Sequence, residues 1–168
     1  MKRKFWIDTD TASDDAVALI MAFMHPDIDV VGVSVVAGNV PLDMGIQNAL
    51  YTAELCGATM PIYAGAAKPL SRELGTAQFV HGEDGMGDIG LPLTGRTPTP
   101  GSGVDKLIEA LHANAGHIEL VTLGPLTNIA LALQKDPSIT KTVKRCVVMG
   151  AVADHIGNVT QVAEFNMW

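Results

Sequence analysis

The stretch KFWIDTDTASDDAVALIMAF, residues 4–23, decides the fold. It opens with a short apolar segment, Lys4 to Ile7, which predicts a buried strand, and continues into a polar cluster, Asp8 to Ser13, which predicts a loop. Ser13 is the expected N-cap of a helix whose apolar positions recur at helical spacing. Those positions are Ala16, Leu19, Ile20 and Phe23. A strand, a loop and a helix in this order are typical of the first unit of an α/β fold.

The same alternation continues along the chain. The run VVGVSVVA within residues 29–37 predicts a strand buried on both faces, and the region 65–103 predicts a long irregular loop, which is usually functional. A capping-box pattern at Ser102 to Asp105 predicts a helix start. Further strands are expected at 61–64, 118–123 and 143–149, and helices at 42–53, 102–111 and 126–134. Residues 1–168 are therefore expected to form a single α/β domain with an open, mostly parallel, Rossmann-like sheet and helices on both faces.

Composition narrows the function classes. The chain has 168 residues, of which 48% are hydrophobic and 17% charged, so it can bury one core. With 11 Lys and Arg against 18 Asp and Glu, the net charge of -7 has the wrong sign for nucleic acid or anionic membranes. No apolar run is long enough for a membrane span and no signal peptide precedes the first strand, so a cytoplasmic protein is expected. Cys56 and Cys146 are expected to be buried thiols.

Four carboxylates lie within eight residues at the end of the first strand: Asp8, Asp10, Asp14 and Asp15. In an open α/β sheet this is the strand end where ligands usually bind. Carboxylates this close repel one another unless a cation neutralises them, and all-oxygen ligands favour calcium or magnesium over zinc. The alternative is that these acids only cap a helix and line a solvated loop. The cluster therefore predicts a divalent-cation site.

The segment Asp8 to Ala16 resembles the DxDxxxDDA signature of the inosine-uridine preferring nucleoside hydrolase family. Similar pieces follow in order over the whole chain: Gly38-Asn39, His81-Gly82 through Gly85, Leu123-Gly124-Pro125-Leu126-Thr127-Asn128, and Asn158 with Glu164-Phe165-Asn166. The resemblance implies the nucleoside hydrolase fold, and it implies that this chain is the N-terminal half of such an enzyme, with the C-terminal part absent.

The resemblance also implies a metal site and a reaction. Asp10 and Asp15 would bind Ca2+ through their carboxylates, together with the backbone carbonyl of Leu123, and Asp8 would lie in or beside that shell. Asp10 would be the general base for a calcium-activated water that hydrolyses the N-glycosidic bond of a ribonucleoside to ribose and free base. Carboxylates around a ribosyl cation would stabilise charge that develops only as the bond breaks.

Further residues are implied to contact the nucleoside. They are Asp14 and Asn166 at the ribose 2' and 3' hydroxyls, Asn158 and Glu164 at the 5' hydroxyl, Asn39 at the water or the sugar, and Met149 at the sugar. His81 would recognise or protonate the base, unless it is a plain loop histidine. The other histidines, His25, His112, His117 and His155, are expected at the surface.

Family members are longer, and their second half is implied to supply a further His-Asp pair, so turnover by this chain alone is left open. Two alternatives remain at this point: a haloacid-dehalogenase-like magnesium phosphatase with Asp8 as nucleophile, and an inactive calcium- or ribose-binding remnant. Gly85 to Gly90 matches GxGxxG, but no strand precedes it, which argues against a dinucleotide site. An incomplete sheet edge favours a homo-oligomer.

Overall fold

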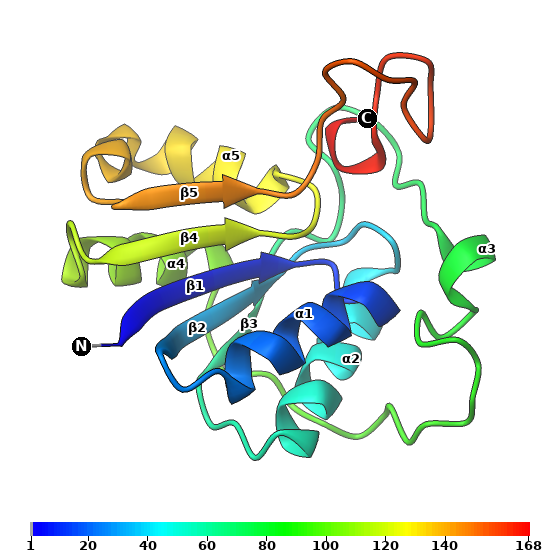
Figure 1. Ribbon diagram of the computed structural model, residues 1–168, viewed down its shortest axis with the longest axis horizontal. Coiled ribbons are helices and arrows are strands. Elements are labelled where there is room, and N and C mark those ends of the chain that lie inside the picture. The colour runs from blue at the N-terminus through cyan, green and yellow to red at the C-terminus, as the bar shows by residue number, and fades with distance from the viewer. Residues whose placement is uncertain (1) are drawn as a thin grey trace.

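A computed structural model describes residues 2–168, and Figure 1 shows a parallel sheet between two layers of helices. The strands are β1 (Arg3–Thr9), β2 (Ile28–Val35), β3 (Ile62–Ala64), β4 (Ile118–Thr122) and β5 (Arg145–Val148). The helices are α1 (Ser13–Met24), α2 (Leu42–Leu55), α3 (Gln78–His81), α4 (Gly103–Ala113) and α5 (Thr127–Lys135), with short 3-10 turns η1 (Pro137–Lys141) and η2 (Phe165–Met167). The predicted α/β fold is confirmed.

The strand order is β3-β2-β1-β4-β5, and every pairing is parallel. From β1 the chain builds the sheet outward to β3, then returns to the other side of β1 for β4 and β5. The order therefore reverses between β1 and β4, and such a switch point opens a crevice at the carboxyl ends of the strands. The acidic segment that follows β1 lies at this crevice.

Side chains that alternate along β1 enter two separate cores. Trp6 packs with α4 and α5 on one face, and Ile7 packs with α1 and α2 on the other; both are 2% exposed. The Trp6 indole Nε1 donates a hydrogen bond of 2.9 Å to Ser34 Oγ, so the buried ring has its polar atom satisfied. Because both faces of β1 are covered, this strand is anchored in both cores next to its carboxyl end.

Local predictions at the helix starts had different outcomes. Ser102 is the N-cap of α4 as predicted, since its Oγ accepts from the Asp105 amide at 3.4 Å. The prediction for Ser13 is wrong: it is the first residue of α1, Ala12 stands at the cap, and no side chain caps the helix. Ser13 Oγ instead lies 3.1 Å from His81 Nδ1, so a contact distant in sequence takes the place of the cap.

The cysteine prediction is also wrong. Cys146 is exposed on β5, which is the edge strand of the sheet, and Cys56 is partly exposed just after α2. The four histidines expected at the surface are exposed. Within the described part of the chain, the helices are too short or too polar to span a bilayer.

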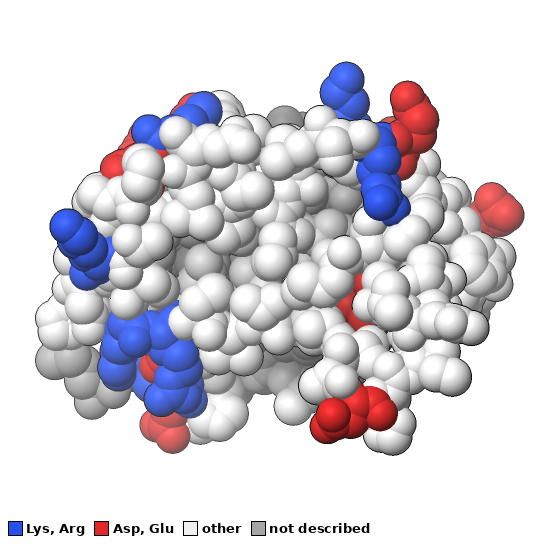
Figure 2. Space-filling view, turned by 90° about the horizontal axis from the view of Figure 1, so that it is seen from above, with Lys and Arg blue, Asp and Glu red and all other residues white. Residues whose placement is uncertain are grey.

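The β5 side of the molecule presents a largely uncharged surface. Figure 2 looks onto this side and shows Lys, Arg, Asp and Glu mainly toward its margins. Val147, Val148 and Met149 are 47%, 40% and 49% exposed here. An edge strand with exposed apolar side chains is a surface suited to further association.

Candidate active site at the end of strand β1

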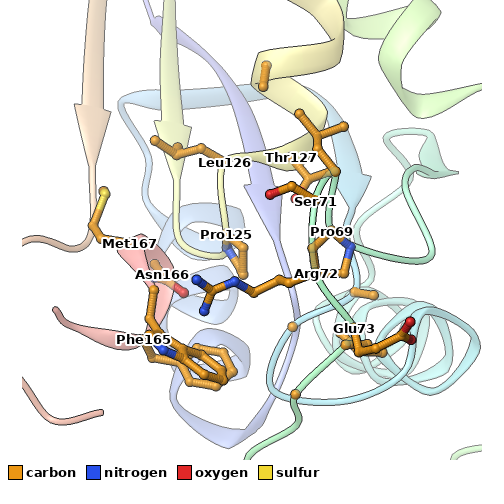
Figure 3. Close-up of a pocket in the computed structure, with 17 residues that line it drawn as sticks. Pro69, Ser71, Arg72, Glu73, Pro125, Leu126, Thr127, Phe165, Asn166 and Met167 are labelled. Carbon is orange, nitrogen blue, oxygen red and sulfur yellow. The ribbon is translucent and has the colours of Figure 1, made fainter. Parts of the chain in front are cut away.

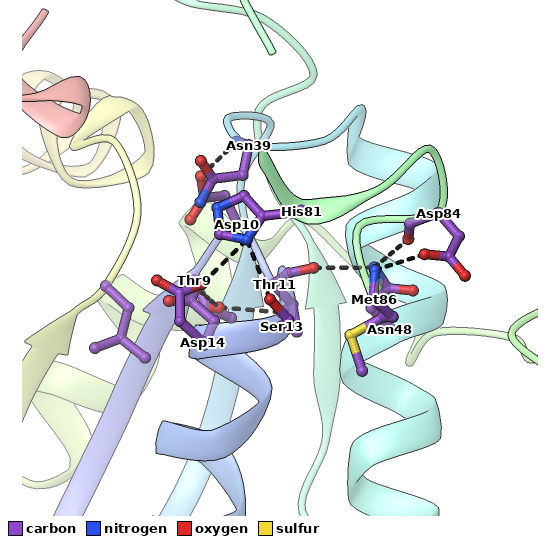
Figure 4. Close-up of polar contacts among 12 residues, drawn as sticks. Thr9, Asp10, Thr11, Ser13, Asp14, Asn39, Asn48, His81, Asp84 and Met86 are labelled. Atoms are coloured by element: carbon purple, nitrogen blue, oxygen red, sulfur yellow. Dashed lines mark hydrogen bonds and ion pairs between the residues drawn. The ribbon is translucent and has the colours of Figure 1, made fainter. Parts of the chain in front are cut away.

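Three strand ends bring the predicted residues together. Asp8 lies on β1 and Asp10 directly after it, Asp15 lies in the first turn of α1, Asn39 follows β2, and Leu123 follows β4. Because β2, β1 and β4 are neighbours and parallel, these positions meet at one edge of the sheet. Figure 4 labels Asp10 and Asn39 at this edge, with Asp14 and His81 beside them.

The Asp10 carboxylate is fully buried. Its Oδ2 accepts a hydrogen bond of 2.6 Å from the Asn39 amide, and its Oδ1 is buried without a hydrogen-bond partner in the protein. Backbone closes in on both sides: a Cβ built at Gly38 would overlap Asp10 Oδ2, and one built at Gly124 would lie 2.7 Å from Oδ1. Only glycine fits at these two positions, which fixes the orientation of the carboxylate and leaves one oxygen for a ligand.

Asp15 is the second buried carboxylate, 6% exposed. Thr9 Oγ1 donates to its Oδ2 at 2.5 Å and lies 3.0 Å from Thr11 Oγ1. Burial raises the pKa of Asp15 to about 6, and burial together with the charge of Asp15 raises the pKa of Asp10 well above its usual range. Two carboxylates that oppose each other's ionisation in a dry site are stabilised in the charged form by a cation.

Asp14 and His81 stand at the solvent side of the same site. The Asp14 side chain is 62% exposed, and its Oδ1 lies 3.9 Å from His81 Nδ1. The His81 side chain is only 14% exposed, because α3 folds back against the start of α1 (Figure 4). The long loop therefore carries His81 to the carboxylates, and the contacts with Ser13 and Asp14 distinguish it from a solvated loop histidine.

The C-terminal residues return to the end of β4. Asn166 Nδ2 donates to the Leu123 carbonyl at 2.7 Å and lies 3.1 Å from Met149 Sδ. Glu164 Oε2 accepts from the Asn166 amide at 3.1 Å. The structure thus groups four of the residues predicted to bind metal or substrate beside the β4 end.

Asn158 is engaged within the C-terminal turn, where its Oδ1 accepts from the Phe165 amide at 2.9 Å. This contact holds the turn that carries Glu164 and Asn166. The described contacts of Asn158 are with backbone and not with the carboxylates of the β1 end.

Asp8 differs from the other carboxylates. It is fully buried, and both Ser34 Oγ and Asn128 Nδ2 donate to its Oδ2, the latter at 2.8 Å. Burial raises its pKa to about 7, against the lowering effect of those hydrogen bonds. Sequence reasoning gave Ser34 and Asn128 no role. A signal existed for Ser34, since a polar residue inside a strand buried on both faces needs a polar partner.

A cavity of about 250 Å3 adjoins this site. It lies between the loop Pro69–Gly75, the turn Pro125–Thr127 and the C-terminal residues Phe165–Trp168 (Figure 3). The Arg72 guanidinium stacks 4.6 Å from the Trp168 ring centre, a cation-π contact that sequence reasoning missed. Asn166 lines both the cavity and the Leu123 contact, so the hollow opens directly beside the candidate site.

Metal-ligand capacity is limited in this chain. Across residues 2–168, no three His, Cys, Asp or Glu side chains are grouped so as to hold a metal ion. The pair Asp10 and Asp15, with nearby carbonyl oxygens, is the oxygen-donor set that the geometry offers.

Residues 5–168 match the sequence profile described as inosine-uridine preferring nucleoside hydrolase. The chain belongs to this family. This match argues against the phosphatase alternative, and the full burial of Asp8, with two donors bonded to its Oδ2, does not suit the nucleophile of that reading.

Individual relatives agree with the family match. The pyrimidine-specific ribonucleoside hydrolase RihB of Escherichia coli is 40% identical over 168 residues, which cover 99% of this chain and 53% of RihB. A plant nucleoside hydrolase structure superposes with a TM-score of 0.94 at 37% identity, covering 99% of this chain and 53% of its own. The structure of the purine-preferring ribonucleoside hydrolase of Gardnerella vaginalis superposes with a TM-score of 0.92 at 31% identity. The match covers 98% of this chain and 54% of that one.

The chain therefore spans about half the length of the relatives that it matches. The predicted nucleoside hydrolase fold is confirmed over that half. One relative is named for pyrimidine and another for purine nucleosides, so family membership leaves the base open.

Proposed function

We propose that the protein to which this chain belongs hydrolyses the N-glycosidic bond of ribonucleosides to ribose and free base, with the β1-end carboxylates at its reaction centre. The observation that carries this proposal is the Asp10 carboxylate: buried, enclosed by two glycines, beside Asp15, and with one oxygen unpartnered. A free buried carboxylate oxygen costs stability unless a ligand uses it.

The cofactor proposed for this site is Ca2+. The donors are all oxygens, which suits a hard cation, and the raised pKa values of Asp10 and Asp15 indicate a site short of positive charge. Asp10, Asp15 and the Leu123 carbonyl would hold the ion. Bound calcium would neutralise the carboxylates and make a nearby water easier to deprotonate.

Asp10 is the proposed general base, because its Oδ1 is buried beside the proposed cation without a hydrogen-bond partner and can accept a proton from a water there. Asp14 is exposed at the site entrance and would bind ribose hydroxyls, together with Asn166. Asn166 now donates to Leu123, so this amide would exchange partners when it binds sugar. Asn39, Met149, Asn158 and Glu164 stay proposed as sugar contacts, and His81 as the group facing the base.

We also propose that the protein is cytoplasmic and self-associates through the largely uncharged β5 side. The exposed Val147, Val148 and Met149 support association there. Sedimentation velocity over a range of concentrations tests it: a sedimentation coefficient that stays at the monomer value throughout would contradict association.

The activity test is ribose release from inosine, uridine and cytidine by this chain, with calcium or with a chelator, alongside phosphate release from p-nitrophenyl phosphate. Asp10→Asn is the matched control, because it keeps the side-chain shape and removes the proposed base. Calcium-dependent ribose release that Asp10→Asn abolishes supports the proposal. Ribose release that persists in Asp10→Asn contradicts the role of Asp10, and the absence of ribose release supports a binding remnant for this chain.

A further inference from the structure

A buried polar network links the elements around the candidate site. It consists of Asp8, Ser34 and Asn128, all 0% exposed, and is called the Asp8 network below. Asp8 and Ser34 are register partners in the β1–β2 pairing, so their side chains lie on the same face of the sheet. Both Ser34 and Asn128 donate to Asp8 Oδ2, and Trp6 Nε1 donates to Ser34 Oγ.

Asn128 extends this network to further segments. Its Oδ1 accepts from the Ala66 amide at 2.8 Å, just after β3, and its Nδ2 lies 3.3 Å from the Val35 carbonyl at the end of β2. A Cβ built at Gly65 would overlap the Asn128 amide, so the backbone after β3 packs directly on this side chain. One residue of α5 thereby joins the carboxyl ends of β1, β2 and β3.

Both walls around Asp10 are attached to the network. Gly38 follows Val35 by three residues, and Gly124 precedes Asn128 by four, in the turn that starts α5. The Leu123 amide donates to the Asp8 carbonyl at 2.7 Å, which ties the proposed carbonyl ligand to the same strand end. A shift of Asn128 would therefore move the glycines that orient Asp10.

The Asp8 side chain is bonded to groups on the Trp6 face of the sheet. It lies two residues from Trp6 on β1, so it shares the face covered by α4 and α5, whereas Asp15 lies in the first turn of α1, which covers the opposite face. Its Oδ2 already accepts two hydrogen bonds. Asp8 Oδ1 has no hydrogen-bond partner. Thr122, the register partner of Asp8 on β4, also has a buried Oγ1 without a partner.

We infer that Asp8, Ser34 and Asn128 are positioning residues that hold Asp10 and the Leu123 carbonyl in place, and that Asp8 does not ligate the cation. This inference rests on the proposed function of Asp10. Asp8 was expected in or beside the metal shell. The inference gives it instead a role in orienting Asp10 and Leu123, the residues proposed to bind the metal.

Two substitutions separate the roles. Asp8→Asn keeps the oxygen that Ser34 and Asn128 bond to, and its new NH2 can donate to Thr122 Oγ1, so the network survives without the charge. Asn128→Ala removes both the donor to Asp8 and the acceptor for Ala66. Ile139→Ala is the stability control, because Ile139 lies in η1 and is 3% exposed in the core, and η1 precedes β5 at the opposite end of the sheet.

The experiment is a calorimetric titration of each purified chain with CaCl2, with a thermal melt of the same samples. Asp8→Asn should stay within about threefold of the unsubstituted affinity, while Asn128→Ala should lose about tenfold or more, as removal of residues that orient metal ligands typically does. Ile139→Ala should melt earlier yet bind calcium like the unsubstituted chain. If Asn128→Ala does not fold, Ser34→Ala, which removes one donor, should show the loss in its place.

The outcomes are distinct. If Asp8→Asn loses as much calcium affinity as Asp10→Asn, Asp8 is a ligand and the inference is overturned. The proposed function would be unaffected. Unchanged calcium affinity in Asn128→Ala and Ser34→Ala would reduce the network to a structural role and also overturn it. No calcium binding by the unsubstituted chain would refute the proposed metal site itself, and the inference with it.

Discussion

Replacing Asp8 with asparagine should flatten the pH dependence of folding stability. Burial raises the Asp8 pKa from 3.8 to about 7, so the folded chain keeps a proton that the unfolded chain releases. A raised carboxyl pKa gives a stabilising contribution that is fully present below the unfolded pKa and is lost as the pH rises through the folded value. The window for Asp8 therefore runs from about pH 4 to about pH 7.

The size of this contribution follows from the shift. A difference of about three pKa units corresponds to about 4 kcal/mol, at 1.36 kcal/mol for each unit. Between pH 4 and pH 8, the unsubstituted chain should lose about 4 kcal/mol more unfolding free energy than Asp8→Asn. Asp10 and Asp15 titrate in both chains, so the difference between the chains reports Asp8 together with its charge coupling to Asp15.

Urea unfolding followed by circular dichroism, at one-unit pH steps and with a chelator present, measures this difference. The two chains should have equal m-values, which shows that only stability has changed. Parallel stability curves for the unsubstituted chain and Asp8→Asn would refute the reasoning, because they would mean that Asp8 is ionised in the folded chain at neutral pH or is not buried.

Three further predictions address the site and the fold. Gly38→Ala places a Cβ on the Asp10 carboxylate, so calcium affinity should fall about tenfold or more in a CaCl2 titration; an unchanged affinity would mean that the carboxylate is free to move. Thr9→Val removes the donor to Asp15, which raises the pKa of Asp15 further and should weaken calcium binding by about 1–3 kcal/mol, more at pH 6 than at pH 8 because protons compete. An equal loss of calcium affinity at pH 6 and pH 8 would contradict proton competition at Asp15 as the cause. Ser102→Ala removes the α4 N-cap and should cost about 1 kcal/mol in urea unfolding while calcium binding stays the same.

The fold was predictable because local pattern and burial agree. The apolar segment before Asp8 and the run in residues 29–37 became β1 and β2, central strands covered on both faces. The misjudged details depend on contacts distant in sequence: Ser13 gives up the cap position and contacts His81. Cys146 was expected to be buried, but β5 is the edge strand of the sheet. The hydrophobic pattern of the sequence predicts strands but not their order in the sheet.

The candidate site was predictable where its residues adjoin one another in sequence. Asp10, Asp14 and Asp15 all lie next to the end of one strand. The cluster of carboxylates in the sequence is enough to indicate them. Asn128 contacts Asp8 from 120 residues away, and Arg72 meets Trp168 across the cavity. Such partners become visible only when the topology brings α5 and the long loop to the same edge of the sheet.

The most direct test of the β1-end site is a crystal structure of this chain grown with calcium. A single calcium peak should lie between the Asp10 and Asp15 carboxylates and the Leu123 carbonyl, with oxygen distances of about 2.3–2.6 Å, and Asp8 should keep its hydrogen bonds to Ser34 and Asn128. A calcium peak elsewhere, or no peak beside Asp10 at saturating calcium, would contradict the account.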